Sequence, residues 1–266
     1  MRWAEEQHGS DALRELAQAL DAAQGEVVVL SGAGVSVSSD IPAFRGRGGL
    51  WHRYDPLEYA HIEAFLHTPE KVWRMLRELD AVLEAASPNP AHDALAELER
   101  LGLVRSVITQ NVDGLHQAAG SETVIELHGS RRTLSCVDCG ATVGREQVLD
   151  TVERGDVPRC ERCGGLLKPD VVLFGEALPA GALERARDEV RDCQILLVVG
   201  TSAEVEPAAS LPALGAGHGA EVWDINPEPS GLPRDLQGPG SAGRRLGLHA
   251  EEALPRLVRL LRADDR

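Results

Sequence analysis

Short unbroken apolar runs recur along the chain, and segments with helical spacing of apolar residues separate them. A run without polar alternation is typical of a strand buried on both faces of a parallel sheet. Helical spacing is found between the runs, as in residues 91–100 and 182–191. The runs themselves are residues 27–30, 104–109, 195–199 and 221–225. Strands that alternate with helices predict an α/β fold, a Rossmann-like doubly wound parallel sheet.

The chain before the first apolar run predicts a helix. Ser10 can cap it and Gly25 can end it, because serine favours the start of a helix and glycine the position after its end. The apolar positions at helical spacing are Leu13, Leu16, Ala17 and Leu20. Near the other end of the chain, residues 228–247 are rich in proline and glycine and predict a surface loop.

Two segments interrupt the alternation of strands and helices. Residues 45–86 open with a glycine-rich loop and continue as helices, whereas residues 132–169 carry four cysteines. Within the first segment, residues 69–83 have a one-sided apolar face that predicts a helix. We expect both segments to be insertions that together form a smaller lobe. The sheet domain then consists of residues 1–44, 87–131 and 170–266.

Composition and charge limit the classes of function. The 266 residues include 42 Asp and Glu against 27 Lys and Arg, a net charge of -15. This balance argues against direct nucleic-acid binding, which needs a basic face for the phosphates. The apolar runs are too short to cross a membrane, and the acidic N-terminal stretch does not match a signal peptide. We therefore expect a cytoplasmic protein with no membrane partner, and the composition carries no prediction of oligomeric state.

Four of the five cysteines form two Cys-x-x-Cys pairs with 20 residues between them. Two such pairs can place four thiolates around one tetrahedral Zn²⁺ ion, and a closed set of four sulfur ligands predicts a structural zinc. The ligands would be Cys136, Cys139, Cys160 and Cys163. The alternatives are a redox pair, which does not need the second Cys-x-x-Cys, and reduced structural cysteines. Cys193, beside an apolar run, is expected to be a small buried apolar residue.

A glycine-containing turn follows the first apolar run directly. Gly32, Ala33 and Gly34 come straight after the predicted strand, and Ser36 follows. Glycine allows the backbone to approach a ligand closely, and a following helix N-terminus would direct free N–H groups at a phosphate. The alternative is that the glycines serve packing alone. Val37 stands where the dinucleotide fingerprint of dehydrogenases has its third glycine, which argues against a dehydrogenase.

Further motifs occur in a fixed order, and their combination is specific. The order is GAGVSVSSDIPAFRG at 32–46, TQNVDGLH at 109–116, ELHGS at 126–130, the two cysteine pairs, KPDVVLFGE at 168–176, GTS at 200–202 and IN at 225–226. In this order the chain resembles the sirtuins, the NAD-dependent protein deacylases, over about residues 10–262. The resemblance implies that NAD is a consumed co-substrate. The acyl group of an acyl-lysine passes to ADP-ribose, and nicotinamide is released.

The resemblance implies a catalytic role for one histidine and two neighbouring polar residues. His128 in ELHGS matches the general base, and imidazole suits that role because its pKa lies near working pH. Asn111 and Asp113 match residues that line the nicotinamide pocket, where Asp113 accepts from the carboxamide; helix capping is the alternative for this pair. Gln110 matches the contact with the nicotinamide ribose. His116 is expected to hold its helix in place.

The resemblance also implies contacts with the rest of NAD. Phe44 and Arg45 match the shield and the phosphate contact of a cofactor loop. In that loop Asp40 stands where glycine is usual, and Ala43 stands where Asp or Thr is usual. The other expected positions are Gly32, Ala33, Gly34 and Ser36 in the first turn, Gly200, Thr201 and Ser202 in the second, Asn226 at the adenosine ribose and Ala250 near the adenine.

Acyl-lysine protein substrates are the expected partners. The resemblance implies that an extended peptide adds as a strand beside Phe174, Gly175 and Glu176. The Val172 carbonyl would accept a hydrogen bond from the acyl-lysine N–H. The alternative for this segment is an ordinary edge strand.

The expected acyl group is small and neutral. In desuccinylating sirtuins a Tyr and an Arg bind the acyl carboxylate, and Leu76 and Leu79 stand at those positions here. An apolar wall cannot satisfy a carboxylate, so the sequence predicts deacetylation. Two rival functions use the same pocket: NAD hydrolysis or mono-ADP-ribosyl transfer, and non-catalytic sensing of NAD or ADP-ribose.

Overall fold

The computed structural model describes residues 2–43, 49–236 and 243–264. The chain divides into two compact units. The first unit comprises Met1–Ser39, Ser87–Leu127 and Ala180–Arg266, and the second comprises Asp40–Ala86 and His128–Pro179.

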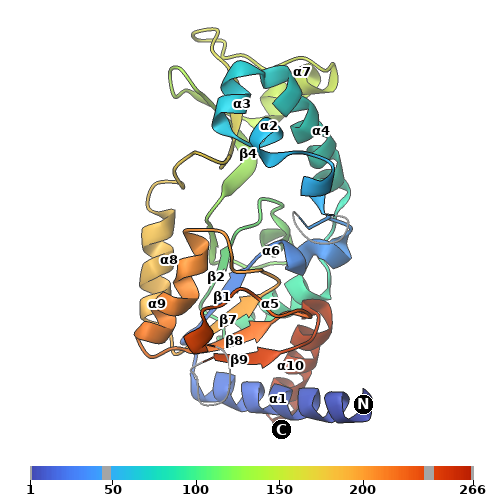
Figure 1. Cartoon of the computed structure of the whole chain (residues 1–266), viewed down its shortest axis with the longest axis vertical. Helices are drawn as coiled ribbons and strands as arrows, with labels where there is room; N and C mark the ends of the chain where they lie inside the picture. The colour runs from blue at the N-terminus through green and yellow to red at the C-terminus, as the bar shows by residue number, and fades with distance from the viewer. Residues whose placement is uncertain (1, 44–48, 237–242, 265–266) are drawn as a thin grey trace. The chain divides into compact units, whose positions relative to one another are not determined.

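A six-stranded sheet forms the centre of the first unit, in the order β3-β2-β1-β7-β8-β9 (Figure 1). Every neighbouring pair in it is parallel, which confirms the predicted doubly wound α/β fold. The strands are β1 (Val27–Ser31), β2 (Ser106–Thr109), β3 (Val124–Glu126), β7 (Ile195–Val199), β8 (Glu221–Ile225) and β9 (Gly243–Leu246). All residues of β1, β2 and β7 are buried, as expected for strands covered on both faces.

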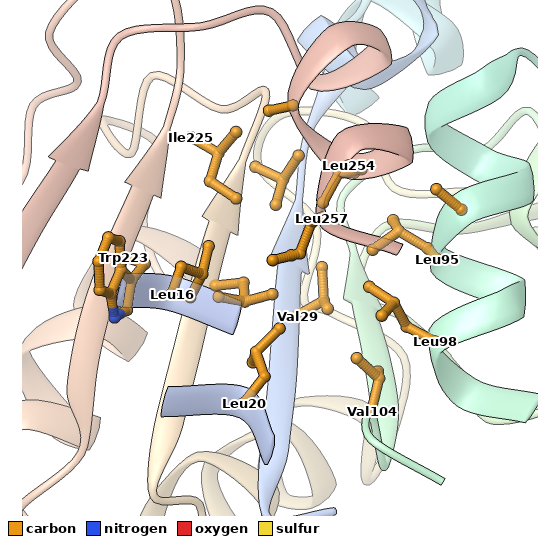
Figure 2. Close-up of a cluster of buried hydrophobic side chains, with 14 of the residues drawn as sticks. Leu16, Leu20, Val29, Leu95, Leu98, Val104, Trp223, Ile225, Leu254 and Leu257 are labelled. Carbon is orange, nitrogen blue, oxygen red and sulfur yellow. The ribbon is translucent and has the colours of Figure 1, made fainter. Parts of the chain in front are cut away.

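Helices cover both faces of this sheet. The first face carries α1 (Arg2–Ala22), α5 (Pro90–Arg100) and α10 (Ala250–Asp264), and the other carries α8 (Ala182–Arg191) and α9 (Leu211–Gly217). Figure 2 shows how Leu16 and Leu20 of α1 meet Leu257 of α10 over Val29 of β1. Each fully buried leucine contributes roughly 1.5–3 kcal/mol relative to an exposed one, so this cluster is a main source of the unit's stability.

Two predictions for the first unit were wrong in their boundaries. The helix predicted to start at Ser10 begins at Arg2, so Ser10 lies inside α1. Its preceding residues include Ala, Glu and Gln, which are good helix formers and extend the helix. The predicted loop at 228–247 contains a 3-10 helix, η5 (Arg234–Leu236), and the edge strand β9. A four-residue edge strand with two arginines has no apolar run to reveal it.

The second unit joins a helical part to a small antiparallel sheet. The sheet has the order β5-β4-β6, with β4 (Gly129–Cys136), β5 (Thr142–Gly144) and β6 (Leu167–Val171). The helices are α2 (Pro56–Tyr59), α3 (Ile62–His67), α4 (Pro69–Ala85) and α7 (Leu149–Glu153), with 3-10 turns η2 (Leu50–His52) and η3 (Arg145–Val148). Phe65 and Trp73 from the helices and Leu134 and Leu167 from the sheet share one apolar cluster.

Ion pairs also tie the helical part of the second unit to its sheet. Asp80 on α4 accepts from Arg131 on β4 at 2.8 Å and also pairs with Arg145. Glu84, one turn further along α4, lies 2.6 Å from Arg131 and 3.2 Å from Arg145. Arg131 therefore holds α4 to β4, and Arg145 holds it to η3. In the described part of the chain, no helix is long and apolar enough to cross a membrane.

Candidate active site

Two glycine turns interlock at the carboxyl ends of neighbouring strands in the first unit. Gly34, after β1, donates its N–H to the carbonyl of Gly200, after β7, at 2.7 Å, and Gly200 in turn donates to Ile225 at the end of β8 at 3.2 Å. A Cβ added to Gly34 would lie 2.6 Å from the Gly200 oxygen, and one added to Gly200 would lie 2.3 Å from the nitrogen of Val35. These glycines therefore serve packing, and the same packing brings three strand ends into one row.

The first turn continues as a short 3-10 helix, η1 (Ala33–Ser39). Ala33 and Gly34 are half-buried at its start, and Ser36 is fully buried. The buried side of η1 thus delivers the Ser36 hydroxyl into the interior of the unit, below the glycine turn.

Ser36 lies at the centre of a buried hydrogen-bond cluster that contains both predicted pocket residues. Its hydroxyl donates to Oδ2 of Asp113 at 2.8 Å and accepts from Nδ2 of Asn111 at 3.2 Å. Asn111 also donates to the carbonyl of Gly32 at 3.1 Å. Asn111 and Asp113 are only 5% and 9% exposed, so these bonds hold their side chains in fixed orientations. We refer to Ser36, Asn111 and Asp113 as the Ser36 cluster.

Helix capping applies to one member of the Asn111 and Asp113 pair. Oδ1 of Asp113 accepts from the N–H of Leu115 at 2.9 Å, at the start of α6 (Leu115–Ala118). The side chain of Asn111 instead reaches Gly32 and Ser36. Capping therefore accounts for one oxygen of Asp113, and it leaves the amide of Asn111 unexplained.

His92 completes the Ser36 cluster, and the sequence interpretation missed it. Its Nδ1 accepts from the N–H of Asn89 at 3.2 Å, so the proton of the neutral ring sits on Nε2, which faces the Ser36 hydroxyl at 3.4 Å. Burial lowers the pKa of His92, so the ring stays neutral although Asp113 opposes this shift. The sequence signal that could have indicated this position is the Asn-Pro-Ala-His segment. It is typical of a capping box, in which the histidine side chain bonds to the backbone of the N-cap residue.

His116 supports the same cluster from its other side. Its Nε2 lies 2.9 Å from the hydroxyl of Ser31, and Ser31 donates to Oγ1 of Thr109 at 2.9 Å. Thr109 Oγ1 also accepts from the backbone N–H of Asn111 at 3.1 Å. Burial, with a smaller contribution from the His92 ring 5.0 Å away between centroids, lowers the pKa of His116 to about 3. His116 thus joins α6 to β1 and β2 as a neutral ring.

Gln110, the residue predicted to contact the nicotinamide ribose, connects the end of β2 to the second turn. Gln110 donates its side-chain N–H to Oγ1 of Thr201 at 2.9 Å, and the backbone of Ala203 donates to the same oxygen at 3.2 Å. The Ser202 side chain is exposed, while its carbonyl accepts from Gly231 at 2.7 Å. This brings Gln110 and the Gly200 turn together.

The remaining NAD positions in the first unit lie at element ends. Asn226 directly follows β8 and is 7% exposed. Ala250 is the first residue of α10 and packs in the apolar cluster of the unit. Phe44 and Arg45 lie outside the described residues.

Asp40 adopts a left-handed backbone conformation, with φ of +62°. Glycine adopts this conformation without cost, and Asp is one of the few other residues that tolerate it. This backbone requirement explains why glycine is usual at the position in the family that the sequence resembles.

The predicted base belongs to the second unit. His128 directly precedes β4 and is half-buried, and its carbonyl accepts from the N–H of Val172 at 2.9 Å. The bond fixes the backbone of His128 against the segment expected to hold the substrate. The Ser36 cluster and His128 thus lie in different units of the chain.

One edge of the predicted peptide-binding segment is already paired. Phe174 donates to the carbonyl of Ala60 at 2.8 Å and accepts from Ile62 at 3.0 Å, and its side chain is 39% exposed. Gly175 follows with φ of +85°. A peptide strand would therefore have to use the carbonyls and N–H groups of this segment that Ala60 and Ile62 do not occupy.

A half-buried lysine secures the same segment. Nζ of Lys168 donates to the carbonyls of Pro169 and Val171, each at 2.8 Å, and lies 3.1 Å from Oε2 of Glu176. The same carboxylate oxygen accepts from the N–H of Leu173 at 2.8 Å. The Glu176 side chain is thus committed to shaping the turn, which leaves its backbone for a substrate.

The four paired cysteines of the second unit fit a zinc ion. Their Sγ atoms all lie within 4.8 Å of one another, with Cys136 3.4 Å from Cys163 and Cys139 3.7 Å from Cys160. Sulfur atoms at tetrahedral corners about 2.3 Å from Zn²⁺ are about 3.8 Å apart, so this spacing suits the metal. A hydrogen bond from the Cys139 backbone lowers the pKa of Cys136 to about 7, which favours the thiolate that binds zinc.

The fifth cysteine stands apart from this set. Cys193 is 5% exposed in the first unit, and burial raises the pKa of its thiol to about 11. Its Sγ donates to the carbonyl of Val190 at 3.3 Å. It is an inert, buried side chain.

Comparison with known proteins places the chain in one family. The sequence model of the Sir2 family matches residues 32–207. The NAD-dependent protein deacylase 2 of Archaeoglobus fulgidus is 44% identical over 251 residues, which cover 93% of this chain and 95% of that protein. A structure solved in work on the mechanism and regulation of Sir2 enzymes superposes with a TM-score of 0.87, at 42% identity over 95% of this chain and 98% of that one. A Sir2–p53 peptide–NAD⁺ complex superposes with a TM-score of 0.79, at 35% identity over 88% and 92% of the two chains. The chain therefore belongs to the Sir2 family.

Proposed function

We propose that this protein is an NAD-dependent protein-lysine deacylase that transfers an acyl group from acyl-lysine to ADP-ribose and releases nicotinamide. Its membership of the Sir2 family and its likeness to a named NAD-dependent deacylase support this function. The observation that carries the proposal is the Ser36 cluster. If Asn111 and Asp113 served only to cap a helix, they would not need to be hydrogen-bonded to a third buried polar side chain at the ends of two strands.

The cluster prepares two groups for nicotinamide. Asp113 is an acceptor whose two oxygens are oriented by Ser36 and Leu115, so it suits the NH₂ of a carboxamide. Asn111 is held at Gly32 and can orient a water or the ribose beside it. When bound, NAD supplies an electrophilic ribose carbon that the acyl oxygen attacks as nicotinamide leaves.

His128 is the proposed general base for the ribose hydroxyl that then attacks the acyl carbon. Neutral imidazole accepts a proton near working pH, and the backbone bond from Val172 holds the residue beside the segment that we propose binds the peptide. A related protein was solved with a peptide and NAD⁺, which supports acyl-lysine peptides as the substrate class here.

We propose acetyl-lysine as the preferred acyl substrate. Leu76 and Leu79, half-buried on α4, offer no partner to the carboxylate of a succinyl group, and burying that charge unpaired costs several kcal/mol. Acetyl-lysine and succinyl-lysine peptides of one sequence should be compared at equal concentration. Faster turnover of the succinyl peptide would overturn the preference.

One assay separates the proposed function from its rivals. The protein is incubated with NAD and an acetyl-lysine peptide, while nicotinamide and O-acetyl-ADP-ribose are measured. Peptide-dependent formation of both products is expected. Nicotinamide release without peptide would indicate hydrolysis or ADP-ribosyl transfer, and binding without turnover would indicate a sensor.

The base is tested by substitution in the same assay. His128→Ala should abolish O-acetyl-ADP-ribose formation without changing thermal unfolding. His67→Ala is the matched control, since His67 is an exposed histidine of the same unit. Retained activity in His128→Ala would remove this residue as the base.

A further inference from the structure

The first unit contains a buried carboxylate that the proposed reaction does not use. Asp224 lies on β8, two residues before Asn226, and is 4% exposed. A buried carboxylate must be compensated by hydrogen bonds or by a cation, because an unpaired one is costly. Its partners therefore indicate what the residue is for.

Both oxygens of Asp224 accept from neutral donors just beyond the strand. Oδ1 accepts from the side-chain Nδ2 of Asn226, and Oδ2 accepts from the hydroxyl of Ser230 at 2.8 Å. Within residues 2–43, 49–236 and 243–264, no ion pair to Asp224 is found. Arg245, its register partner on β9, instead donates to the backbone carbonyls of Asn226 and Pro227, at 3.3 and 2.7 Å.

This arrangement decides which way the Asn226 amide faces. An ionised carboxylate only accepts hydrogen bonds, so the NH₂ end of the amide must point to Asp224 and its carbonyl oxygen must point away. A residue with a free amide could present either end to a ligand. Asn226 is instead held as an acceptor, which suits a hydroxyl group that donates.

The same carboxylate also secures the loop after Asn226. Ser230 bonds to Asp224, and the next residue, Gly231, donates to the carbonyl of Ser202 at 2.7 Å. The loop is thereby fastened both to β8 and to the Gly200 turn. Asp224 therefore fixes the side chain of Asn226, and the loop contacts fix the backbone that follows it.

We propose that Asp224 is a positioning residue that orients Asn226 to accept a hydrogen bond from a hydroxyl of the adenosine ribose of NAD. The proposal rests on the proposed function, because that function places Asn226 at this ribose. Asp224 itself does not touch the ligand. Its effect is confined to the ribose hydroxyls and to NAD affinity.

A double-mutant cycle, in which one change is made in the protein and the other in the ligand, tests this role of Asp224. The dissociation constants of ADP-ribose and of its 2′,3′-dideoxyadenosine analogue are measured by calorimetry for wild type, Asp224→Ala, which removes both acceptor oxygens, and Asn226→Ala. Glu221→Gln is the control, since Glu221 lies on the same strand and pairs with Arg244 at 2.5 Å. Turnover with an acetyl-lysine peptide gives kcat and KM for NAD.

Asp224→Ala should bind ADP-ribose about tenfold more weakly, the upper size of the one neutral hydrogen bond between the Asn226 amide oxygen and the ribose hydroxyl. This variant should bind the dideoxy analogue almost as well as it binds ADP-ribose. Wild type and Glu221→Gln should instead bind the analogue about tenfold more weakly than ADP-ribose. KM for NAD should rise while kcat stays unchanged. Unchanged ADP-ribose binding in Asp224→Ala, or a full further loss with the analogue, would overturn the proposal.

Different results would exclude the role of Asp224 and the deacylase activity. Should Asn226→Ala bind ADP-ribose as wild type does, the ribose contact and the role of Asp224 both fall, while peptide-dependent release of nicotinamide would still support deacylation. Absence of that release would instead count against the proposed function.

A second measurement applies if Asp224→Ala does not fold. The side-chain amide of Asn226 in wild type is assigned by NMR from its absence in Asn226→Ala. One of its two protons should be shifted downfield and protected from exchange by Asp224. Two solvent-like protons would refute the orientation.

Discussion

His116 should make the first unit sensitive to acid at pH values where an ordinary histidine begins to protonate. The ring is 1% exposed, and no hydrogen-bond partner of its Nδ1 is found in the described part of the chain. Burial lowers its pKa from 6.5 to about 3. The unfolded chain therefore binds a proton at this residue below pH 6.5, while the folded chain does so only near pH 3. Stability is lost as the pH falls through that window and is fully present above it.

The magnitude follows from proton linkage. Each pH unit between the two pKa values removes about 1.4 kcal/mol, so lowering the pH from about 7 to about 4.5 removes about 3 kcal/mol through His116 alone. His92 acts in the same direction, because burial lowers its pKa too. Such a loss is a large fraction of the total stability of a domain, which is roughly 5–15 kcal/mol.

The variant His116→Gln isolates this effect. Glutamine can still donate to Ser31 but does not titrate, so its urea midpoint should fall less with acid than that of wild type. The midpoint is read at both pH values from pulsed hydrogen exchange of the β1 and β2 peptides, which reports the first unit alone. His218→Gln serves as the control because His218 is exposed on the same unit. An equal acid shift in wild type and His116→Gln would refute the reasoning, as would an NMR midpoint near pH 6.5 for the His116 ring.

Three other perturbations test separate features. Ser36→Ala removes the hydroxyl shared by Asp113 and Asn111, so it should destabilise the first unit by about 2–3 kcal/mol in urea and weaken NAD binding, through the nicotinamide pocket. The exposed Ser38→Ala should change neither. Asp40→Val forces a β-branched residue into φ of +62° and should cost more than about 1 kcal/mol, whereas Asp40→Gly should be neutral or stabilising in thermal unfolding; equal melting of the two would contradict the backbone argument. Cys136→Ser should lower bound zinc, measured by mass spectrometry, and melt the second unit earlier, while Cys193→Ser should retain zinc; full zinc in Cys136→Ser would exclude it as a ligand.

The buried strands could be predicted because burial leaves a continuous signal. β1 and β7 are runs of consecutive apolar residues, and α8 has the predicted bounds, 182–191. β3 and β9 were not predicted, because they have only three and four residues and include charged side chains. Such strands form through pairing with a neighbour already in the sheet, which no local pattern records.

The site was harder to predict than the fold, since its contacts join distant parts of the chain. Motifs indicated Ser36, Asn111 and Asp113, but not that Ser36 would bond to Asp113 across 77 positions or to His92 across 56. His92 resembled a helix-start residue, and its pairing with Ser36 exists only once η1 and α5 are packed in one unit. A hydrogen bond of this kind leaves no periodic trace in the sequence.

The contact between the Gly34 and Gly200 turns has a consequence for how the family can vary. Either Cβ would occupy space already filled by the backbone of the opposite turn, so the first substitution forces both turns apart. Once they have separated, the second Cβ costs less than it would alone, and the two changes should show strong epistasis. A substitution at one of the two glycines therefore changes the cost of a substitution at the other. We expect the residues at these two positions, which are distant in the sequence, to vary together among related proteins.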